Sequence, residues 1–176
     1  MLYFQFRSVL VTLMVFVGVL VSWSGAFLLI WLYGQSWFLD FSVFGSPLRE
    51  VFQVHPIHLS VAVWVGFLAL FGISDDDGVV MGTFLMQEFR DSNPETVQQI
   101  REATIRSGKR RIRAALMTGT TTMLALVPVL TLTGRGADIM VPMAIPSFGG
   151  MTIEIITMLI VPVLYCGWKE LNLKTD

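Results

Sequence analysis

The chain has 176 residues, of which 54% are hydrophobic and 14% are charged, and its mean hydropathy is +0.68. Soluble domains carry about 25% charged residues, so this composition excludes an ordinary soluble protein and favours a membrane protein. The formal net charge of −1 gives no basic surplus for binding nucleic acid. The single cysteine, Cys166, excludes an internal disulfide and a metal site built from several cysteines.

Four apolar stretches follow one another along the chain and predict four transmembrane helices. They cover about residues 8–33, 57–86, 114–133 and 139–167. Each stretch contains the roughly 20 mostly apolar residues that a bilayer requires. We therefore expect an all-α membrane protein with one membrane domain over residues 1–176.

Basic residues are concentrated between the second and third predicted spans, and this fixes the expected orientation. Between the first two predicted spans, residues 34–56 contain one arginine, Arg49, and no lysine. Residues 89–113 contain Arg90, Arg101, Arg106, Lys109, Arg110, Arg111 and Arg113. By the positive-inside rule we expect the basic segment and both termini in the cytoplasm of a bacterium, with the chain in the inner membrane.

The two longer connections carry patterns of their own. Residues 34–56 are aromatic, which predicts a periplasmic loop lying at the membrane surface. The aromatic residues are Trp37, Phe38, Phe41, Phe44 and Phe52. Residues 94–108 predict a cytoplasmic amphipathic helix, capped by Ser92 or Asn93 with Glu95 near its start, and ending near Gly108.

Three consecutive carboxylates, Asp75, Asp76 and Asp77, interrupt the apolar second span. Ionisable groups inside a spanning helix are costly and mark functional sites or ion pathways. Neighbouring carboxylates in a low dielectric cannot all be ionised. Successive residues of a helix point about 100° apart, so at most two of the three can face one partner. The alternative is that the helix is interrupted here and the acids cap or hydrate the break.

Several motifs follow one another along nearly the whole chain. They are LYFQFRS at residues 2–8, HLSVAV at 58–63 with the run from Gly66 to Met81, RIRAALMT at 111–118, GRGADIM at 134–140, GGM at 149–151 and PVLY at 162–165. In this order they resemble the last four helices of a resistance-nodulation-division (RND) permease, nearest the heavy-metal efflux branch. The resemblance implies that the predicted spans are the ninth to twelfth helices of such a permease.

The resemblance also implies a proton relay. Asp76 falls at the position of a tenth-helix acid of that relay, flanked by Asp75 and Asp77. Arg113 and Thr118 match the basic residue and the threonine at the start of the eleventh helix.

Two differences from the family's pattern follow Arg113. The usual proline is Ala114 here, and the lysine that often comes next is Ala115. The other interpretation of Arg113 is a cation that reaches the membrane surface. These patterns assign no role to Glu154, which lies in the last span.

Metal binding by the chain itself has only weak support in the sequence. His55 and His58 are spaced so that two imidazoles could bind one metal ion, but no third ligand is nearby, which favours a structural role. The scattered methionines are ordinary filler of membrane helices. We expect no cofactor apart from lipids, and a metal ion only as the transported substrate of the family.

Two functions remain open. In the first, the chain is a truncated or split fragment of a proton-driven heavy-metal efflux permease for copper, silver, zinc or cobalt. It would not be transport-competent alone and would need other membrane polypeptides to supply the missing helices. In the second, it is a non-catalytic structural subunit derived from such a permease, packed in a larger membrane complex such as a respiratory or photosynthetic assembly. The sequence contains no enzyme motif, so we do not expect an enzyme.

Overall fold

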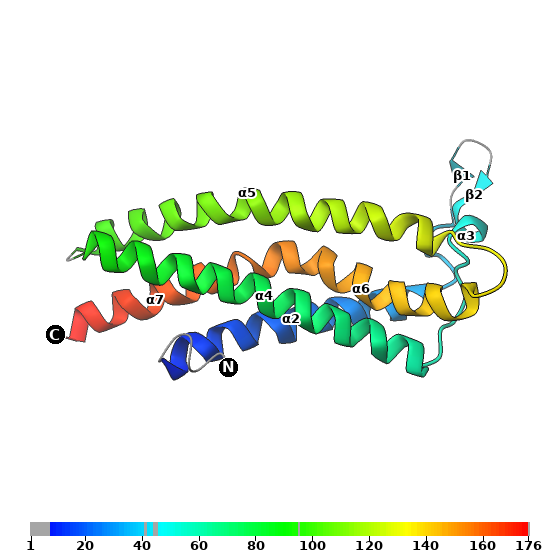
Figure 1. The fold of residues 1–176 in the computed structure, drawn as a ribbon, viewed down its shortest axis with the longest axis horizontal. Coiled ribbons are helices and arrows are strands. Elements are labelled where there is room, and N and C mark those ends of the chain that lie inside the picture. The colour runs from blue at the N-terminus through cyan, green and yellow to red at the C-terminus, as the bar shows by residue number, and fades with distance from the viewer. Residues whose placement is uncertain (1–7, 41, 44–45, 95, 176) are drawn as a thin grey trace.

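The computed structural model describes residues 8–40, 42–43, 46–94 and 96–175, which form a bundle of long helices (Figure 1). The elements are α2 (Val9–Tyr33), β1 (Ser42–Val43), β2 (Ser46–Pro47), α3 (Leu48–Val51), α4 (Val61–Ser92), α5 (Val97–Leu130), α6 (Ala137–Thr157) and α7 (Ile160–Thr175). The strands form only a short antiparallel ladder. The predicted all-α class is therefore confirmed. The motif at residues 2–7 lies outside the described residues, as do Phe41, Phe44 and Glu95.

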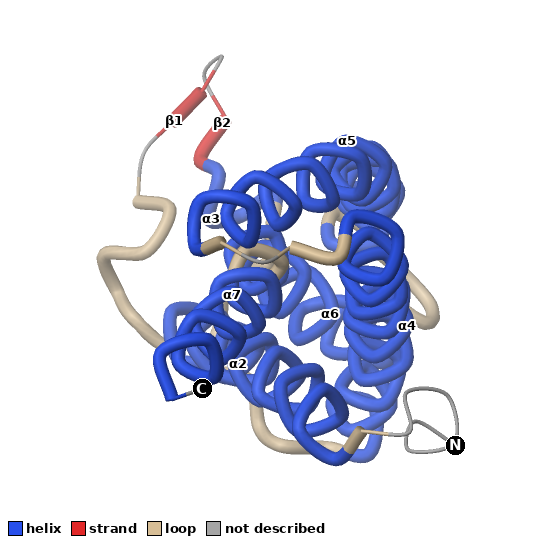
Figure 2. Tube along the Cα trace, turned by 90° about the vertical axis from the view of Figure 1, so that its left-hand side faces the viewer, coloured by secondary structure: helices blue, strands red, loops and turns tan. Residues whose placement is uncertain are grey.

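Helix α6 lies in the middle of the bundle and contacts α2, α4, α5 and α7 (Figure 2). Small residues allow this close packing, as is usual between membrane helices. A Cβ atom added to Gly25 of α2 would lie 2.9 Å from the Gly149 carbonyl oxygen of α6. On α4, a Cβ atom added to Gly66 would lie 2.2 Å from the Met143 carbonyl oxygen. The contacts of α2 and of α4 with α6 therefore depend on glycine.

Three helical stretches are long and apolar enough to cross a membrane by length and composition, namely Val9–Tyr33, Val97–Leu130 and Ala137–Leu171. The last of these combines α6 and α7. Helix α4 is not among them because its three aspartates lie near its middle and leave no apolar stretch of spanning length. It nevertheless lies alongside α2 and α6 (Figure 1). The predicted span on α4 therefore stays a prediction.

Helix α5 begins later than predicted. Its cap is Thr96, whose hydroxyl accepts from the Gln99 backbone N–H while the Gln99 side chain accepts from the Thr96 N–H. The predicted caps belong instead to the end of α4, where Asn93 adopts the left-handed conformation with φ of 37°. Residues 92–96 contain cap-forming residues that suit either the end of α4 or the start of α5, and the structure shows which cap is used at each end.

Helix α5 also continues through Gly108 to Leu130, so the predicted amphipathic helix and the third span are one helix. A glycine ends a helix when it takes a positive φ. Among the described glycines, Gly134 and Gly136 have a positive φ, and Gly108 stays helical. The prediction of a separate helix ending near Gly108 was therefore wrong.

Proline explains the interruption between α6 and α7 at Met158 and Leu159. Pro162 has no backbone N–H to donate, and its ring crowds the carbonyl group four residues earlier, which belongs to Met158. The fourth predicted span is thus a helix with one broken turn.

The predicted periplasmic loop packs onto one end of the bundle. Phe38 and Phe52 lie against a buried cluster that includes Tyr33 and Leu130. Arg49 donates to the Ser36 carbonyl oxygen at 2.5 Å and closes the loop on itself. The loop therefore covers the end at which α2 finishes and α4 begins.

Candidate functional site

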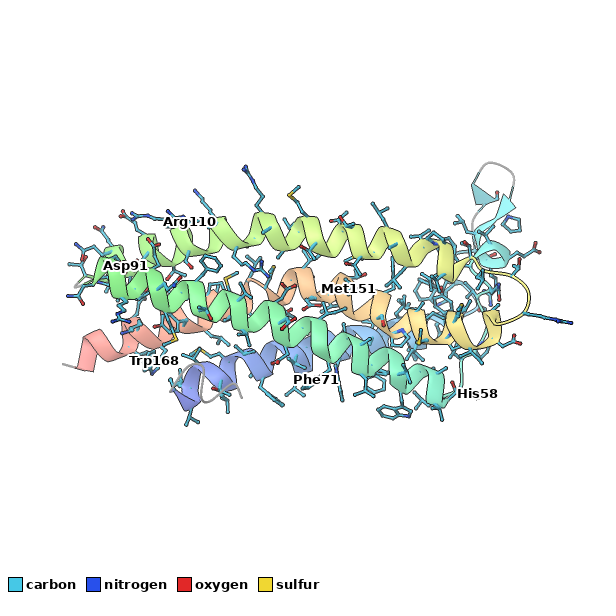
Figure 3. The ribbon with its side chains drawn as sticks, viewed as in Figure 1. His58, Phe71, Asp91, Arg110, Met151 and Trp168 are labelled. Carbon is cyan, nitrogen blue, oxygen red and sulfur yellow. The ribbon has the colours of Figure 1, made fainter. Side chains whose placement is uncertain are left out.

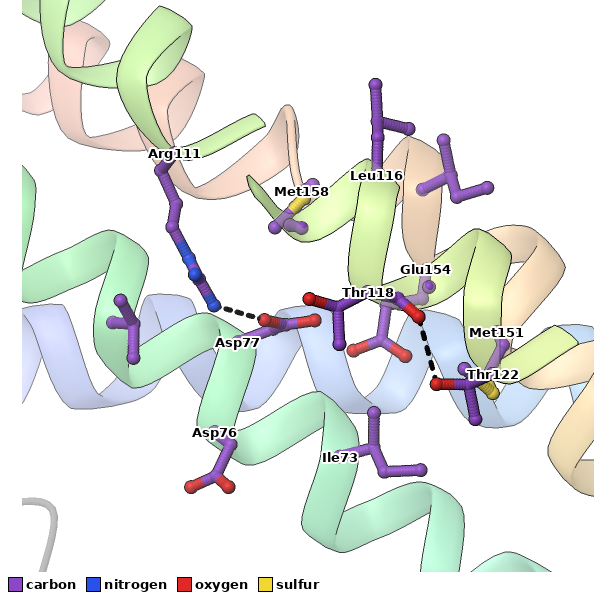
Figure 4. A pocket seen from close by; sticks show the side chains of 14 residues that line it. Ile73, Asp76, Asp77, Arg111, Leu116, Thr118, Thr122, Met151, Glu154 and Met158 are labelled. Atoms are coloured by element: carbon purple, nitrogen blue, oxygen red, sulfur yellow. Dashed lines mark hydrogen bonds and ion pairs between the residues drawn. The ribbon is translucent and has the colours of Figure 1, made fainter. Parts of the chain in front are cut away.

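A cavity of about 440 Å³ lies between α4, α5 and α6 (Figure 4). Most of its lining is apolar and includes Ile73, Met151 and Met158. Its charged and hydroxyl-bearing side chains are Asp76, Asp77, Arg111, Thr118, Thr122 and Glu154. Several polar groups thus converge in a mainly apolar cavity, which is the usual composition of a functional site.

An ion pair between Asp77 and Arg111 crosses this cavity from α4 to α5. The distance between Arg111 Nη2 and Asp77 Oδ1 is 2.5 Å, and the two side chains are 18% and 20% exposed. The Nε atom of Arg111 is buried and has no hydrogen-bond partner among the described residues. The guanidinium is therefore mostly desolvated, and Asp77 is the carboxylate that compensates its charge.

The three aspartates do not share one environment. Helix α4 runs without interruption from Val61 to Ser92, so the alternative of a broken helix is wrong. Asp77 faces α5, and Asp76 is exposed and lines the cavity. Asp75 does not line the cavity, and its Oδ1 atom is buried without a described partner. The spacing of about 100° per residue separates the three side chains as predicted.

Arg111 occupies the place in the cavity that the sequence comparison suggested for Arg113. Arg113 is exposed, and the ion pairs found in the described part of the chain do not include it. Thr118 does line the cavity, and its hydroxyl donates to the Ala114 carbonyl oxygen at 3.1 Å.

Helical phase explains this choice of arginine. Arg111 precedes Thr118 by seven residues, which is about two turns of a helix, so both lie on one face. Arg113 is rotated by about 200° from Arg111. The phase relative to Thr118 could have selected Arg111 from the sequence.

Glu154 is the acid that the sequence left without a role. It is 7% exposed, and its Oε1 atom is buried without a partner among the described residues. It lies on α6 between Met151 and Met158, which also line the cavity (Figure 4). The sequence signal that could have identified Glu154 is a single acid inside an apolar stretch of a spanning helix.

His58 lies at the end of the molecule opposite Arg110 and Trp168 (Figure 3), and His55 precedes it by three residues. Both are exposed, and His55 Nδ1 donates to the Gln53 carbonyl oxygen at 2.5 Å. Within the described residues, no group of three or more His, Cys, Asp or Glu side chains could hold a metal ion. The structure thus adds no third ligand to the histidine pair.

Comparisons with known proteins match the region that contains the cavity. Residues 50–168 match the AcrB/AcrD/AcrF family. The chain is 36% identical over 115 residues to the cation efflux system protein CusA of Escherichia coli (strain K12), a match covering 61% of this chain and 11% of that protein.

Two further relatives have similar names. The chain is 28% identical over 166 residues to the cobalt-zinc-cadmium resistance protein CzcA of Cupriavidus metallidurans, covering 94% of this chain and 13% of the relative. It is 30% identical over 126 residues to the nickel-cobalt-cadmium resistance protein NccA of Alcaligenes xylosoxydans xylosoxydans, covering 71% and 11%. The chain thus spans between 11% and 13% of the length of these relatives. No solved structure matches the chain significantly.

Proposed function

The chain belongs to the AcrB/AcrD/AcrF family, and from this membership we propose that it forms part of the membrane domain of a proton-driven heavy-metal efflux permease. The names of the relatives support a metal cation as the exported substrate, since they refer to cations, to cobalt, zinc and cadmium, and to nickel, cobalt and cadmium. In this proposal the chain is a transporter segment and not an enzyme, and it does not transport alone.

The ion pair between Asp77 and Arg111 is the observation that carries the proton-driven part of the proposal. A proton that binds Asp77 removes its charge and leaves the Arg111 guanidinium without a counter-ion in a mostly desolvated cavity. Since the two residues lie on different helices, uptake of the proton favours separation of α4 from α5. Proton binding would in this way be converted into movement of a helix. Asp75, Asp76 and Thr118 remain candidate members of this relay, and Arg111 replaces Arg113.

Exposed apolar side chains on the outer face of α5 support the proposal that this face contacts lipid or other helices inside the membrane. Met117 is 68% exposed and Leu124 is 65% exposed, although both are apolar and lie in a helix long enough to span. Lipid or further helices of the permease would cover this face. We place the chain in the bacterial inner membrane with α4 as a fourth span, so that both termini are cytoplasmic.

The test is metal uptake into everted inner-membrane vesicles that contain the assembled permease including this chain. With a pH gradient imposed, Asp77→Asn should reduce zinc, cobalt or copper uptake to the background of vesicles without permease. Asp138→Asn is the matched control, because Asp138 is exposed in the first turn of α6 and does not line the cavity.

Normal assembly with wild-type uptake in the Asp77→Asn permease would contradict the relay. That result would leave the structural-subunit alternative.

A further inference from the structure

The ion pair leaves one buried carboxyl group of the cavity unexplained. Glu154 is 7% exposed, and its Oε1 atom has no partner among the described residues. An isolated ionised carboxylate in such a place is very costly unless a cation accompanies it. The cation that lines the cavity is Arg111, and it is already bound to Asp77. Charge balance therefore calls for a single positive charge on or beside Glu154.

A proton supplies that charge. Among the described residues that line the two cavities beside Glu154, Arg111 is the one with a positive charge, and it is bound to Asp77. A proton on the carboxyl group of Glu154 removes the cost of an isolated buried carboxylate.

We propose that Glu154 is a second proton-carrying residue of the bundle. This inference rests on the proposed function, to which it adds a residue of α6. The proton is taken from water in the cavity of about 440 Å³ and returned to it, so no other reactant is required. Of the two carboxyl groups of the cavity that are not exposed, Arg111 compensates Asp77 and the proton neutralises Glu154.

The surroundings of Glu154 allow such an exchange. A second cavity of about 20 Å³ is lined by Asp77, Glu154 and Ser74, which is room for about one water molecule. The other helices that line it, α2 and α7, contribute Val15, Gly18 and Val161, and therefore no charge. The charged groups facing Glu154 in the two cavities are Asp76, Asp77 and Arg111.

The proton can be observed without any transport assay. Infrared spectra of the chain in lipid nanodiscs at neutral pH would be recorded for the wild type and for Glu154→Gln. Their difference should contain the carbonyl stretch of a protonated carboxyl group, shifted when the water is replaced by D2O. The symmetric and antisymmetric stretches of a carboxylate in its place would overturn the proposal. Glu102→Gln is the control, because Glu102 is exposed and should give the carboxylate bands.

A second variant keeps the proposal testable if Glu154→Gln does not fold. Ser74→Ala keeps the glutamate but changes a side chain that lines the same cavity of about 20 Å³, so the protonated carboxyl band should move in frequency and remain. A change confined to the carboxylate bands would show that Glu154 is ionised, which overturns the proposal.

Transport measurements distinguish a failure of this inference from a failure of the proposed function. In everted vesicles with the assembled permease, Glu154→Gln should lower metal uptake at least tenfold. If Glu154→Gln keeps wild-type uptake and Asp77→Asn loses it, the proposed role of Glu154 is overturned and the role of Asp77 is not. Wild-type uptake in both variants would overturn the proposed relay and with it this inference.

Discussion

At the scale of single residues, Arg111 joins two helices through a charge that has little contact with water. Arg111→Ala leaves Asp77 desolvated without its partner, and removal of one member of a buried pair costs about 3 kcal/mol. We expect the free energy of unfolding to fall by about 2–3 kcal/mol, because the two side chains keep 18% and 20% of their exposure. Unfolding by SDS in mixed micelles, followed by tryptophan fluorescence, measures this change.

The control for Arg111→Ala is Arg113→Ala on the same helix. Arg113 is exposed, and surface substitutions usually change stability by less than about 0.5 kcal/mol. Adding Asp77→Asn to Arg111→Ala should restore part of the loss, because the unpaired charge is then absent. Equal losses from the two arginine variants would contradict the assignment of the pair.

The same residues show where sequence reasoning reached the site and where it stopped. Asp76, Asp77 and Thr118, which line the cavity, could be predicted, because ionisable groups in an apolar helix stand out and the family motif contains the threonine. The choice between Arg111 and Arg113 depends on helical phase, and the motif alone did not supply it. Glu154 could not be assigned, because the cavity that it lines is formed with Asp77 and Arg111, which lie on other helices.

At the scale of the element, the packing of α4 on α6 depends on a glycine at the contact. A Cβ atom added to Gly66 would lie 2.2 Å from the Met143 carbonyl oxygen, and the backbone cannot yield as a flexible side chain can. We expect Gly66→Ala to lower the free energy of unfolding by about 1–3 kcal/mol, as overpacking does. The same SDS titration checks this change.

Gly72→Ala provides the matched control within α4. A Cβ atom there meets nothing within 4 Å, and alanine in a helix is more stable than glycine by about 0.5–1 kcal/mol. Gly72→Ala should therefore stabilise the protein slightly or leave it unchanged. Similar losses from both substitutions would mean that helix propensity, and not the contact with α6, governs α4.

The helices were predicted more reliably than their ends. Apolar length predicts a spanning helix because the bilayer requires it, and the predicted positions of the spans coincide with α2, α4, the second half of α5, and α6 with α7. The cap at Thr96 and the continuity through Gly108 depend on local hydrogen bonds and dihedral angles. Several residues near Thr96 could have capped the helix, and Gly108 could have ended it, so the sequence did not decide where α5 begins and ends.

At the scale of the whole molecule, α4 decides the topology. The connection after α2, the start of α4 and the connection between α5 and α6 lie at one end of the bundle, and the connection between α4 and α5 lies at the other (Figure 1). If α4 spans, the connection between α2 and α4 and the connection between α5 and α6 share one side of the membrane, and the chain crosses an even number of times. If α4 does not span, the connection after α2 shares a side with the connection before α5. Asp77 binds Arg111 of α5 and Asp76 lines the cavity, and both placements are compatible with a spanning α4.

Cysteine labelling distinguishes these two topologies. In a Cys166→Ser background, single substitutions Ser36→Cys, Lys109→Cys and Arg135→Cys place thiols at exposed positions. They lie in the connection after α2, in the basic first half of α5 and in the connection between α5 and α6. A membrane-impermeant maleimide applied to spheroplasts should label Ser36→Cys and Arg135→Cys, whereas Lys109→Cys should react only after lysis. The physical reason is the positive-inside rule, which retains the basic segment around Lys109 in the cytoplasm. Labelling of Arg135→Cys without Ser36→Cys would exclude α4 as a span, because the two positions would then lie on opposite sides. Labelling of Lys109→Cys in intact spheroplasts would instead reverse the orientation and place the basic segment in the periplasm.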